Sequence, residues 1–484
     1  MLTFVPDFEL EYSESLNYMK RVEVPLEYTC FIPRNLDVDK FLSDNPPSFE
    51  YQRDYFVYII SLIFSIPAHN KDFDLVKSNG FVPISSAILQ SKIHEYKDYM
   101  KYLLDNNIFV TDGKYSNDGA KSLWYKFSNL YDEKIAIPVK ITKYTLIKSI
   151  IYNSNPKEEN YLPETPLEEV AYLTKWFNSY LQIDMQGVEN CLNQLMEQER
   201  QAPLTKIRAV SRFNQRKIEV EKLYNHEYNL SVDRTSGRFH SPLTRLKSEL
   251  RKFVTYNDEK LISLDLKNSQ PFLSLVFTDI GLFRKNNLQD IISIYNKKFV
   301  SKSDNLIPSP QLVRLEQAII ESSKHPDMTE YRKYVSEGTF YEHWAILSGR
   351  YGYTIPELNI DPRGEAKENI FQILFSSNTS IGGNEDIRLF SALFDSIYDI
   401  FRLVKQGRGY HNTLACTLQY IESQLIIHRV CKTVAENNPE IPLFTIHDSI
   451  ATTEKYVDYV QQVMQNIIKE AIGADPIIKR EVWE

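Results

Sequence analysis

Two short apolar segments in the second half of the chain, each carrying an aspartate, constrain the fold more than any other feature. LISLDL contains Asp265, and LFTIHDSIAT contains Asp448. Both segments are rich in β-branched residues, so each is expected to form a buried strand that ends or turns at its aspartate. Helix-like stretches lie between them. From Ser231 onward, the sequence therefore predicts a small antiparallel sheet surrounded by helices.

The expected positions of the two aspartates indicate a chemistry. A single carboxylate at a strand end is usually a cap or a turn residue. Two of them on adjacent strands, Asp265 and Asp448, would repel each other unless cations bridged them. Two Mg²⁺ ions held in this way can activate a 3′ hydroxyl group and neutralise a pyrophosphate leaving group. The pair is therefore a candidate site for in-line phosphoryl transfer.

A third segment, DPRGEAKENIFQILFSSN, has the pattern of a helix with one unusual face. Asp361 and Pro362 are typical of a helix start. A spacing of four residues then places two cations and two aromatic rings on a single stripe: Arg363, Lys367, Phe371 and Phe375. In one interpretation the helix is merely amphipathic, with both phenylalanines in the core. In the other, the stripe binds a nucleoside triphosphate, with the cations on its phosphates and the rings against sugar and base.

In this order, the three segments resemble the palm and fingers of single-subunit family A polymerases, of the DNA polymerase I and phage-type RNA polymerase kinds. LDLKNSQPFL is similar to motif A, RGEAKENIFQILF to motif B and IHDS to motif C. Upstream, RTSGRFHSPLTRLKSELRKF is similar to the family's T-x-GR segment. The resemblance covers residues 231–484. It implies a right-hand polymerase with an antiparallel palm sheet and helical fingers.

The resemblance also implies a role for each matching residue. Asp265 and Asp448 become the catalytic aspartates that bind two Mg²⁺ ions, with Mn²⁺ as a possible substitute. Arg363 and Lys367 hold the triphosphate, and Lys367 is placed to protonate the leaving pyrophosphate. The residues assigned to the incoming nucleotide are Phe371, Phe375, Gln270 and Ser269. Those assigned to the primer-template are Arg238, Arg251, Gln419 and His447.

Several positions depart from the family pattern and leave the choice of sugar open. DNA polymerases of the family usually carry a glutamate, the steric gate against the ribose 2′ hydroxyl, where this chain has Gln270. The D-x3-S spacing that ends at Ser269, like the His-Asp-Ser of motif C, is closer to phage-type RNA polymerases. Those enzymes end motif B in a tyrosine, however, and Phe375 has no hydroxyl group with which to recognise ribose. The T-x-GR segment and Gln419 favour the DNA branch, so DNA synthesis is slightly favoured.

The N-terminal half lies outside the resemblance and is divided by composition alone. Residues 1–50 are expected to form an arm, and residues 136–230 a helical, thumb-like or linking region. Residues 51–135 are expected to form a winged-helix-like domain. Helical spacing runs from Ile88 to Leu104, and two short apolar stretches follow around the turns Asp112-Gly113 and Asn117-Asp118-Gly119. With residues 231–484 as palm and fingers, the fold class is α+β and mainly helical.

Charge and composition set the remaining limits. The net charge is −8, but residues 200–252 hold thirteen Lys or Arg and five acidic residues, a local charge of +8 that indicates phosphate binding. The four cysteines form no CxxC pair, which fits a reducing cytoplasm. The N-terminus does not have the pattern of a secretory signal. The longest apolar run, Tyr55 to Ala68, is too short to span a bilayer and is expected to be a buried helix.

Three classes of function remain open from the sequence. The first is a template-directed polymerase that uses a primer-template and nucleoside triphosphates, with DNA synthesis slightly favoured over a phage-type RNA polymerase or primase. The second is a winged-helix nucleic-acid-binding replication protein with an inactive palm. The third is a structural or partner-binding protein, for which the ordered motifs would be a coincidence. The intact aspartates, Arg363 and Lys367 argue against the second class.

Overall fold

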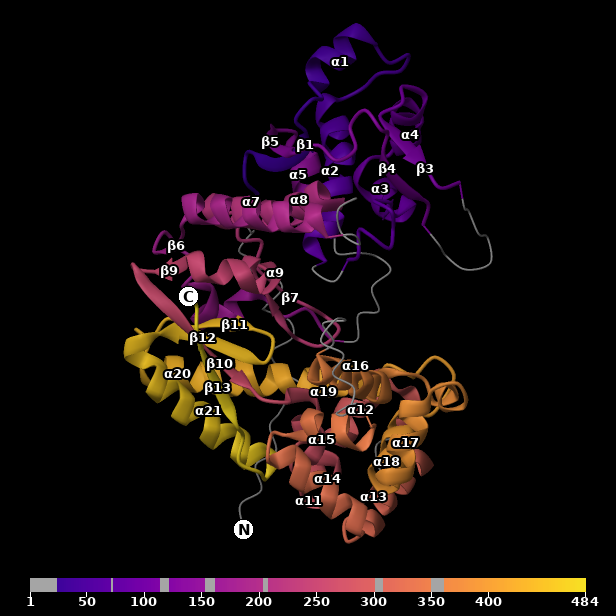
Figure 1. Ribbon diagram of the computed structural model, residues 1–484, viewed down its shortest axis with the longest axis vertical. Coiled ribbons are helices and arrows are strands. Elements are labelled where there is room, and N and C mark those ends of the chain that lie inside the picture. The colour runs from indigo at the N-terminus through magenta and orange to yellow at the C-terminus, as the bar shows by residue number, and fades with distance from the viewer. Residues whose placement is uncertain are drawn as a thin grey trace, which may run out of the picture. The chain divides into compact units, whose positions relative to one another are not determined.

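Strand β10 (Glu259–Leu266) lies inside the main sheet, which is antiparallel throughout (Figure 1). The computed structural model describes residues 24–70, 73–113, 122–152, 162–202, 208–300, 308–349 and 361–484. The strand order of the sheet is β11 (Phe444–Ile446), β12 (Ser449–Thr453), β10, β9 (Val254–Tyr256) and β6 (Leu181–Ile183). The last strand of the chain, β13 (Ile478–Val482), also pairs with β10.

Local sequence explains how this sheet turns. Only Asn257 and Asp258 separate β9 from β10, and both have a positive φ, of 51° and 63°. Asparagine and aspartate tolerate this left-handed conformation, which two-residue hairpin turns require. The predicted strand around Asp265 is confirmed, although the aspartate lies one residue before the end of β10. The expected antiparallel sheet within a mainly helical α+β fold is also confirmed.

The chain divides into two compact units, and the sheet belongs to the second. Unit 1 comprises Met1–Pro67, Asp74–Pro156 and Ile207–Asn214, and unit 2 comprises Ala68–Phe73, Lys157–Lys206 and Gln215–Glu484. The helices of unit 2 that bear on the site are α10 (Ser269–Leu273), α15 (Phe340–Leu347), α16 (Pro362–Phe375), α19 (Thr413–Ser423) and α21 (Val457–Ile472). Helix α21 packs on β10 and β12, and Gly473, with φ +74°, ends it.

Other helices of unit 2 complete its α-helical part. They are α6 (Ala171–Thr174), α7 (Met185–Gln201), most of α8 (Ala209–Tyr224), α9 (Pro242–Arg245), α11 (Ile280–Lys285), α12 (Leu288–Tyr295), α13 (Pro310–Ser322), α14 (Pro326–Ser336), α17 (Glu385–Leu393), α18 (Asp395–Val404) and α20 (Lys432–Asn437). Helices α7 and α8 lie within residues 136–230, the region that was expected to be helical. A small hairpin joins β7 (Ser231–Val232) to β8 (Phe239–His240).

Unit 1 is built from short helices and two small sheets. Strands β1 (Tyr28–Pro33) and β5 (Ala136–Ile141) pair antiparallel, and a second sheet has the order β2 (Val82–Pro83), β4 (Trp124–Phe127), β3 (Phe109–Thr111). Its helices are α1 (Val38–Asp44), α2 (Arg53–His69), α3 (Ser86–Lys92), α4 (Tyr96–Asp105) and α5 (Tyr144–Tyr152). The division between the units falls inside α2 and α8. The two units group the chain differently from the four predicted segments, which stay a prediction.

The predicted helices of unit 1 are present. The apolar run from Tyr55 to Ala68 lies within α2, as expected for a buried helix. The helical spacing from Ile88 to Leu104 is divided between α3 and α4, and α4 ends at Asp105, directly after that run. The turn predicted at residues 117–119 lies outside the described residues. In the described part of the chain, no helix combines the length and the apolar character needed to cross a membrane.

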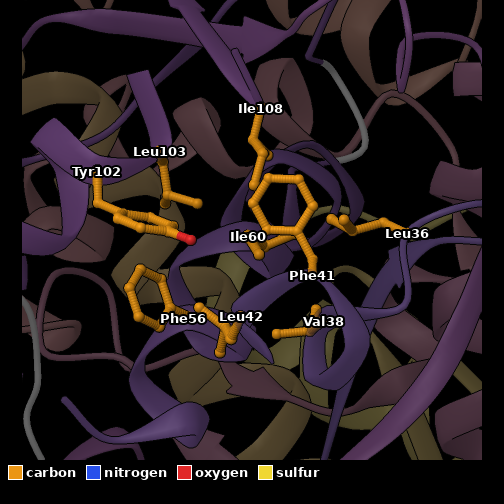
Figure 2. Close-up of a pocket in the computed structure, with 9 residues that line it drawn as sticks. All are labelled: Leu36, Val38, Phe41, Leu42, Phe56, Ile60, Tyr102, Leu103 and Ile108. Atoms are coloured by element: carbon orange, nitrogen blue, oxygen red, sulfur yellow. The ribbon is translucent and has the colours of Figure 1, made fainter. Parts of the chain in front are cut away.

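The core of unit 1 contains a small apolar hollow (Figure 2). It is lined by Leu36, Val38, Phe41, Leu42, Phe56, Ile60, Tyr102, Leu103 and Ile108. The Tyr102 hydroxyl group, the one side-chain oxygen in this lining, already donates to the backbone carbonyl of Asn45. The rings of Phe56 and Tyr102 lie 5.0 Å apart. The hollow is therefore a feature of core packing, without polar groups to orient a ligand.

Candidate active site

The two predicted aspartates are brought together by neighbouring strands of the main sheet. Asp265 of β10 lies directly opposite Ser449, the first residue of β12. Asp448 immediately precedes Ser449, in the two-residue turn that joins β11 to β12. The other turn residue, His447, has a φ of +54°, a conformation that few non-glycine residues adopt. The hairpin thus holds Asp448 and His447 at the end of β12 that lies beside Asp265.

The two carboxylates affect each other electrostatically. Burial and the negative charge of Asp448 raise the pKa of Asp265 from 3.8 to about 6, although the cations of Lys367 and Lys479 lower it. Within the described residues, neither aspartate forms an ion pair with a cationic side chain. The arrangement therefore retains like-charge repulsion that a bound cation would relieve.

Helix α16 carries the predicted stripe on a face that is not its core face. Its buried residues are Ala366, Asn369, Ile370, Ile373 and Leu374. Arg363 and Lys367 are exposed, whereas Phe371 and Phe375 are half-buried, with their ring centroids 5.5 Å apart. The Lys367 ammonium lies 5.5 Å from the Phe371 ring centroid, and its charge acts on Asp265. The interpretation that places both phenylalanines in the core is therefore wrong.

Both ends of α16 are held by side chains. At its start, Asp361 accepts a hydrogen bond from the backbone N–H of Arg363 at 3.1 Å. At its end, Lys405 donates to the carbonyl groups of Ile373 and Ser376, at 3.1 and 3.0 Å. Burial lowers the pKa of Lys405 to about 8. Side chains therefore satisfy backbone groups at both ends of the helix that carries the stripe.

Arg363 is already engaged by the neighbouring helix α15. Its Nε donates to Glu342 at 2.9 Å, and its guanidinium group lies 5.5 Å from the ring centroid of Tyr341. Burial raises the pKa of Tyr341, and the negative charge of Asp448 raises it further. Tyr341 therefore lies within electrostatic reach of both Asp448 and Arg363. A phosphate that binds Arg363 has to compete with Glu342.

A buried carboxylate joins two other predicted residues. Glu422 of α19 is 2% exposed and accepts hydrogen bonds from Nε and Nη2 of Arg238, at 2.9 and 2.6 Å. Its other oxygen accepts from Nε2 of Gln270 at 2.6 Å. Burial raises the pKa of Glu422 to about 7, Arg238 opposes this shift, and Asp448 adds to it. Arg238 and Gln270 thus meet at one residue that the sequence did not single out.

The turn that carries Arg238 is organised by Asp233. One carboxylate oxygen of Asp233 accepts from the backbone N–H groups of Thr235 and Ser236, and the other accepts from that of Arg238. These hydrogen bonds and His240 lower the pKa of Asp233 to about 2 although burial opposes them. Gly237 has φ +71°, and a side chain there would approach Ser423 of α19. The turn therefore rests closely against α19.

The remaining predicted residues lie around this group. Ser269 begins α10, one residue before Gln270, and Gln419 is half-buried on α19, less than one helical turn before Glu422. Arg251 is partly buried, with its guanidinium group 6.0 Å from the Trp483 ring centroid. Burial lowers the pKa of Arg251, while Glu481 and Asp265 raise it. The structure therefore brings Arg251 near Asp265 as well.

Many cations of the basic segment are paired with acidic side chains of the protein. In the described structure, at least seven of its thirteen basic residues form ion pairs with acidic side chains: Arg200, Arg208, Arg216, Lys217, Lys222, Arg238 and Arg245. Several of these are buried, such as Lys222, which is 3% exposed. Part of the segment's positive charge is therefore neutralised within the protein, and phosphate binding by the segment stays a prediction.

The residues present fit a pair of hard divalent cations. The described chain contains no cluster of three or more His, Cys, Asp or Glu side chains arranged as metal ligands. A divalent ion at this site would be held by two protein carboxylates, those of Asp265 and Asp448. Mg²⁺ is typically held by one or two carboxylates, with waters and substrate phosphates completing its shell. Near Asp265, Asn268 is 5% exposed, and its side-chain amide has no hydrogen-bond partner among the described residues. The donor set therefore suits Mg²⁺ more than a softer metal.

Four residues at this site were missed by sequence reasoning: Asp233, Tyr341, Glu422 and Lys479. Asp233 had a usable signal, because an aspartate two residues before Thr-Ser-Gly is typical of a side-chain-capped turn. The other three had none. A tyrosine or a glutamate in a helix and a lysine near the chain end are ordinary in sequence. Their positions depend on tertiary contacts.

Comparisons with known proteins add little information about this site. No protein-family model matches the chain, and no curated protein matches its sequence. Among solved structures, the chain is similar to the POL domain of Pol1 from M. smegmatis, in complex with DNA primer-template and dNTP. The TM-score is 0.29 and the identity 15%, over 60% of this chain and 55% of that chain. The chain thus spans about half the length of that domain, and a TM-score this low does not establish a shared fold.

Proposed function

We propose that this protein is a template-directed nucleic-acid polymerase, with DNA synthesis slightly favoured. The observation that carries the proposal is the approach of two aspartates far apart in sequence, Asp265 of β10 and Asp448 in the turn that leads into the neighbouring strand β12. Lys367 of α16 lies within electrostatic reach of the same site.

In the proposed reaction, each side chain has a separate task. Asp265 and Asp448 hold two Mg²⁺ ions, or Mn²⁺ in their place. When bound, such ions lower the pKa of a 3′ hydroxyl group and stabilise the charge that develops on the phosphates. Lys367 binds the triphosphate and delivers a proton to the departing pyrophosphate. The rings of Phe371 and Phe375 contact the base and sugar of the incoming nucleotide.

A second group of residues, centred on Glu422, is proposed to orient the nucleic acid and the sugar. Glu422 fixes the guanidinium group of Arg238, which is proposed to contact the primer-template. It also fixes the amide of Gln270, the residue proposed to lie beside the sugar. The Oε1 atom of Gln270 is buried and has no partner among the described residues, so a hydroxyl donor would reach it only after the side chain turned. Because such a donor could be a ribose 2′ hydroxyl, the preference for DNA is only slight.

The direct test is primer extension on DNA and RNA templates, with dNTPs and NTPs supplied in separate reactions. The wild type is expected to extend the primer only with Mg²⁺ or Mn²⁺, and more efficiently with dNTPs. The variant Asp448→Ala is expected to extend neither set. Labelled product that is independent of Asp448 and of divalent ions would refute the proposed site. A strong preference for NTPs would leave the site intact and assign the protein to RNA synthesis.

A second prediction separates the two cations of the α16 stripe. Lys367→Ala is expected to lower kcat/KM for the nucleotide by about 100-fold, the loss of a charge-assisted phosphate contact worth roughly 3 kcal/mol. Arg363→Ala is expected to lose about 10-fold, because its guanidinium group is already paired with Glu342. Glu368→Ala, an exposed neighbour outside the stripe, serves as the control and is expected to match the wild type. Equal losses for Glu368→Ala and Lys367→Ala would contradict the assignment.

A second candidate function is nucleic-acid binding without synthesis. It is favoured by the order of elements in unit 1, where α2, β2, α3, α4, β3 and β4 follow one another with sheet order β2-β4-β3, as in winged-helix domains. The exposed residues of α4 include two cations and two acids, namely Lys97, Lys101, Asp98 and Asp105. A helix that reads DNA is normally basic, so this one is better suited to a protein surface. Binding that survives loss of both aspartates, without any synthesis, would support this candidate.

A further inference from the structure

The last strand of the chain brings a cation into the row of residues that contains Asp265. In the antiparallel register of β13 and β10, Lys479 lies directly opposite Asp265. Residues directly opposite each other in such a pair project from the same face of the sheet. On the other side of β10, Ser449 lies opposite the same aspartate. Lys479 therefore borders the carboxylate pair on the side away from β12.

Adjacent residues of β13 separate the two faces of the sheet. Arg480 projects to the opposite face, where its guanidinium group donates to Asp458 of α21 at 2.6 Å. The Lys479 ammonium group lies instead 3.2 Å from Glu481, the next residue on its own face. The Lys479 and Glu481 side chains are 62% and 58% exposed. Because so exposed an ion pair is weak, Lys479 is available to a stronger anionic partner.

The register that places Lys479 is firmly set by Trp483. This side chain is 4% exposed, and its indole N–H donates to the Ser263 hydroxyl group at 2.6 Å. Its backbone N–H donates to the carbonyl group of Leu261 at 3.0 Å. A shift of one residue in the register between β13 and β10 would move Lys479 to the opposite face of the sheet and remove Trp483 from its buried position. The position of the lysine beside Asp265 is therefore built into the fold.

Besides the partly buried Arg251, two exposed cations thus lie near Asp265 on different elements, Lys367 on α16 and Lys479 on β13. Both lower the pKa of Asp265 against the effects of burial and Asp448. Lys367 lies on the stripe that is proposed to bind the triphosphate. A polymerase has a second polyanionic substrate, the nucleic-acid strand that it extends. Lys479 lies on β13, apart from α16. It could therefore bind the nucleic-acid strand while Lys367 binds the triphosphate.

We infer that Lys479 binds a backbone phosphate of the primer-template next to the reacting end. The inference rests on the proposed polymerase function and adds a nucleic-acid contact from the end of the chain. A lysine suits this task because its ammonium group acts as a point charge that accepts phosphate oxygens from several directions. Each such contact releases a condensed counterion, so its loss changes the salt dependence of binding as well as the affinity.

The test is equilibrium binding of a fluorescent DNA primer-template, measured without divalent ions over a range of salt concentrations. Lys479→Gln is expected to weaken binding about 5- to 10-fold and to reduce the slope of log K against log salt by about one. Lys479→Arg is expected to retain most of the affinity. Arg480→Gln, one residue away but on the other face, is the matched control and is expected to differ from the wild type by less than about twofold.

The outcomes distinguish this inference from the proposed function. If the wild type binds and extends the primer, but Lys479→Gln and Arg480→Gln share its affinity and salt slope, the inference alone is overturned. A wild type that neither binds nor extends a primer-template overturns both. Unfolding curves for both variants, followed by tryptophan fluorescence, control for a displaced β13, because Trp483 lies in that segment.

Discussion

Replacing Asp265 with asparagine is expected to lower the rate of nucleotide addition about a thousandfold or more, without unfolding the protein. A bound divalent ion supplies several kcal/mol of charge stabilisation in the transition state, and about 4 kcal/mol corresponds to this factor. Asparagine has nearly the same shape and leaves the backbone pairing of β10 with β12 and β13 in place. The measurement is single-nucleotide extension under saturating primer-template, with Mg²⁺ and with Mn²⁺.

The same substitution is expected to stabilise the protein in the absence of divalent ions. The pKa of Asp265 is raised from 3.8 to about 6 by burial and by Asp448. An acid whose pKa is higher in the folded state binds its proton more tightly there. The protonated carboxyl group therefore stabilises the folded state fully below about pH 4, and this stabilisation is lost as the pH rises through about 6. At pH 7 the buried, ionised carboxylate of Asp265 lowers the free energy of unfolding. Asp265→Asn removes this charge, so the free energy of unfolding is expected to rise by about 2 kcal/mol.

The two effects of Asp265→Asn point in opposite directions, and this separates a functional residue from a structural one. Asp458→Asn, on the opposite face of the sheet, is a suitable control, because that aspartate pairs with exposed Arg480. It is expected to change both activity and stability little. A variant Asp265→Asn that retains a tenth of the wild-type rate, or that unfolds more easily at pH 7, would contradict the view of Asp265 as a buried metal ligand.

The parts of the site that sequence could predict are those fixed by local pattern. An apolar, β-branched run forms β10, and a two-residue turn around Asp448 follows β11. The four-residue spacing of Arg363, Lys367 and the two phenylalanines describes one face of α16, because helical geometry alone dictates it. In each case the structural outcome depends on residues within one helix or hairpin.

The parts that sequence could not predict depend on contacts between distant segments. Glu422 lies in CTLQYIESQLI, where a glutamate is an ordinary surface residue, and its burial results from the packing of α19 against the Arg238 turn. The position of Lys479 depends on the pairing of β13 with β10, which no local sequence pattern predicts. The ion pairs of the basic segment could not be predicted for the same reason. A count of charges along the chain does not show which of them meet a carboxylate, as Arg245 and Lys222 meet Glu219.

Removal of the Glu422 carboxylate is expected to be the most destabilising single change at the site. Glu422→Ala leaves the guanidinium group of Arg238 and the amide of Gln270 without their acceptor in a buried location. Breaking a buried pair in this way costs about 3 kcal/mol or more, because the remaining charge is uncompensated. The measurement is urea unfolding followed by tryptophan fluorescence. This signal reports mainly on unit 2, which contains Trp176, Trp344 and Trp483.

Two further variants show whether the charge or the shape of Glu422 matters. Glu422→Gln is expected to cost only about 1 kcal/mol, because burial already raises the pKa of this carboxyl group to about 7. Its amide can still accept from Arg238, and Gln270 can turn its unpartnered Oε1 toward the new N–H group. Glu316→Ala, which removes the partner of exposed Arg284, is the control and is expected to cost less than about 1 kcal/mol. If Glu422→Ala were no more destabilising than Glu316→Ala, Arg238 and Gln270 would have to be positioned by something other than Glu422, and their shared orientation beside Asp448 would lose its physical cause.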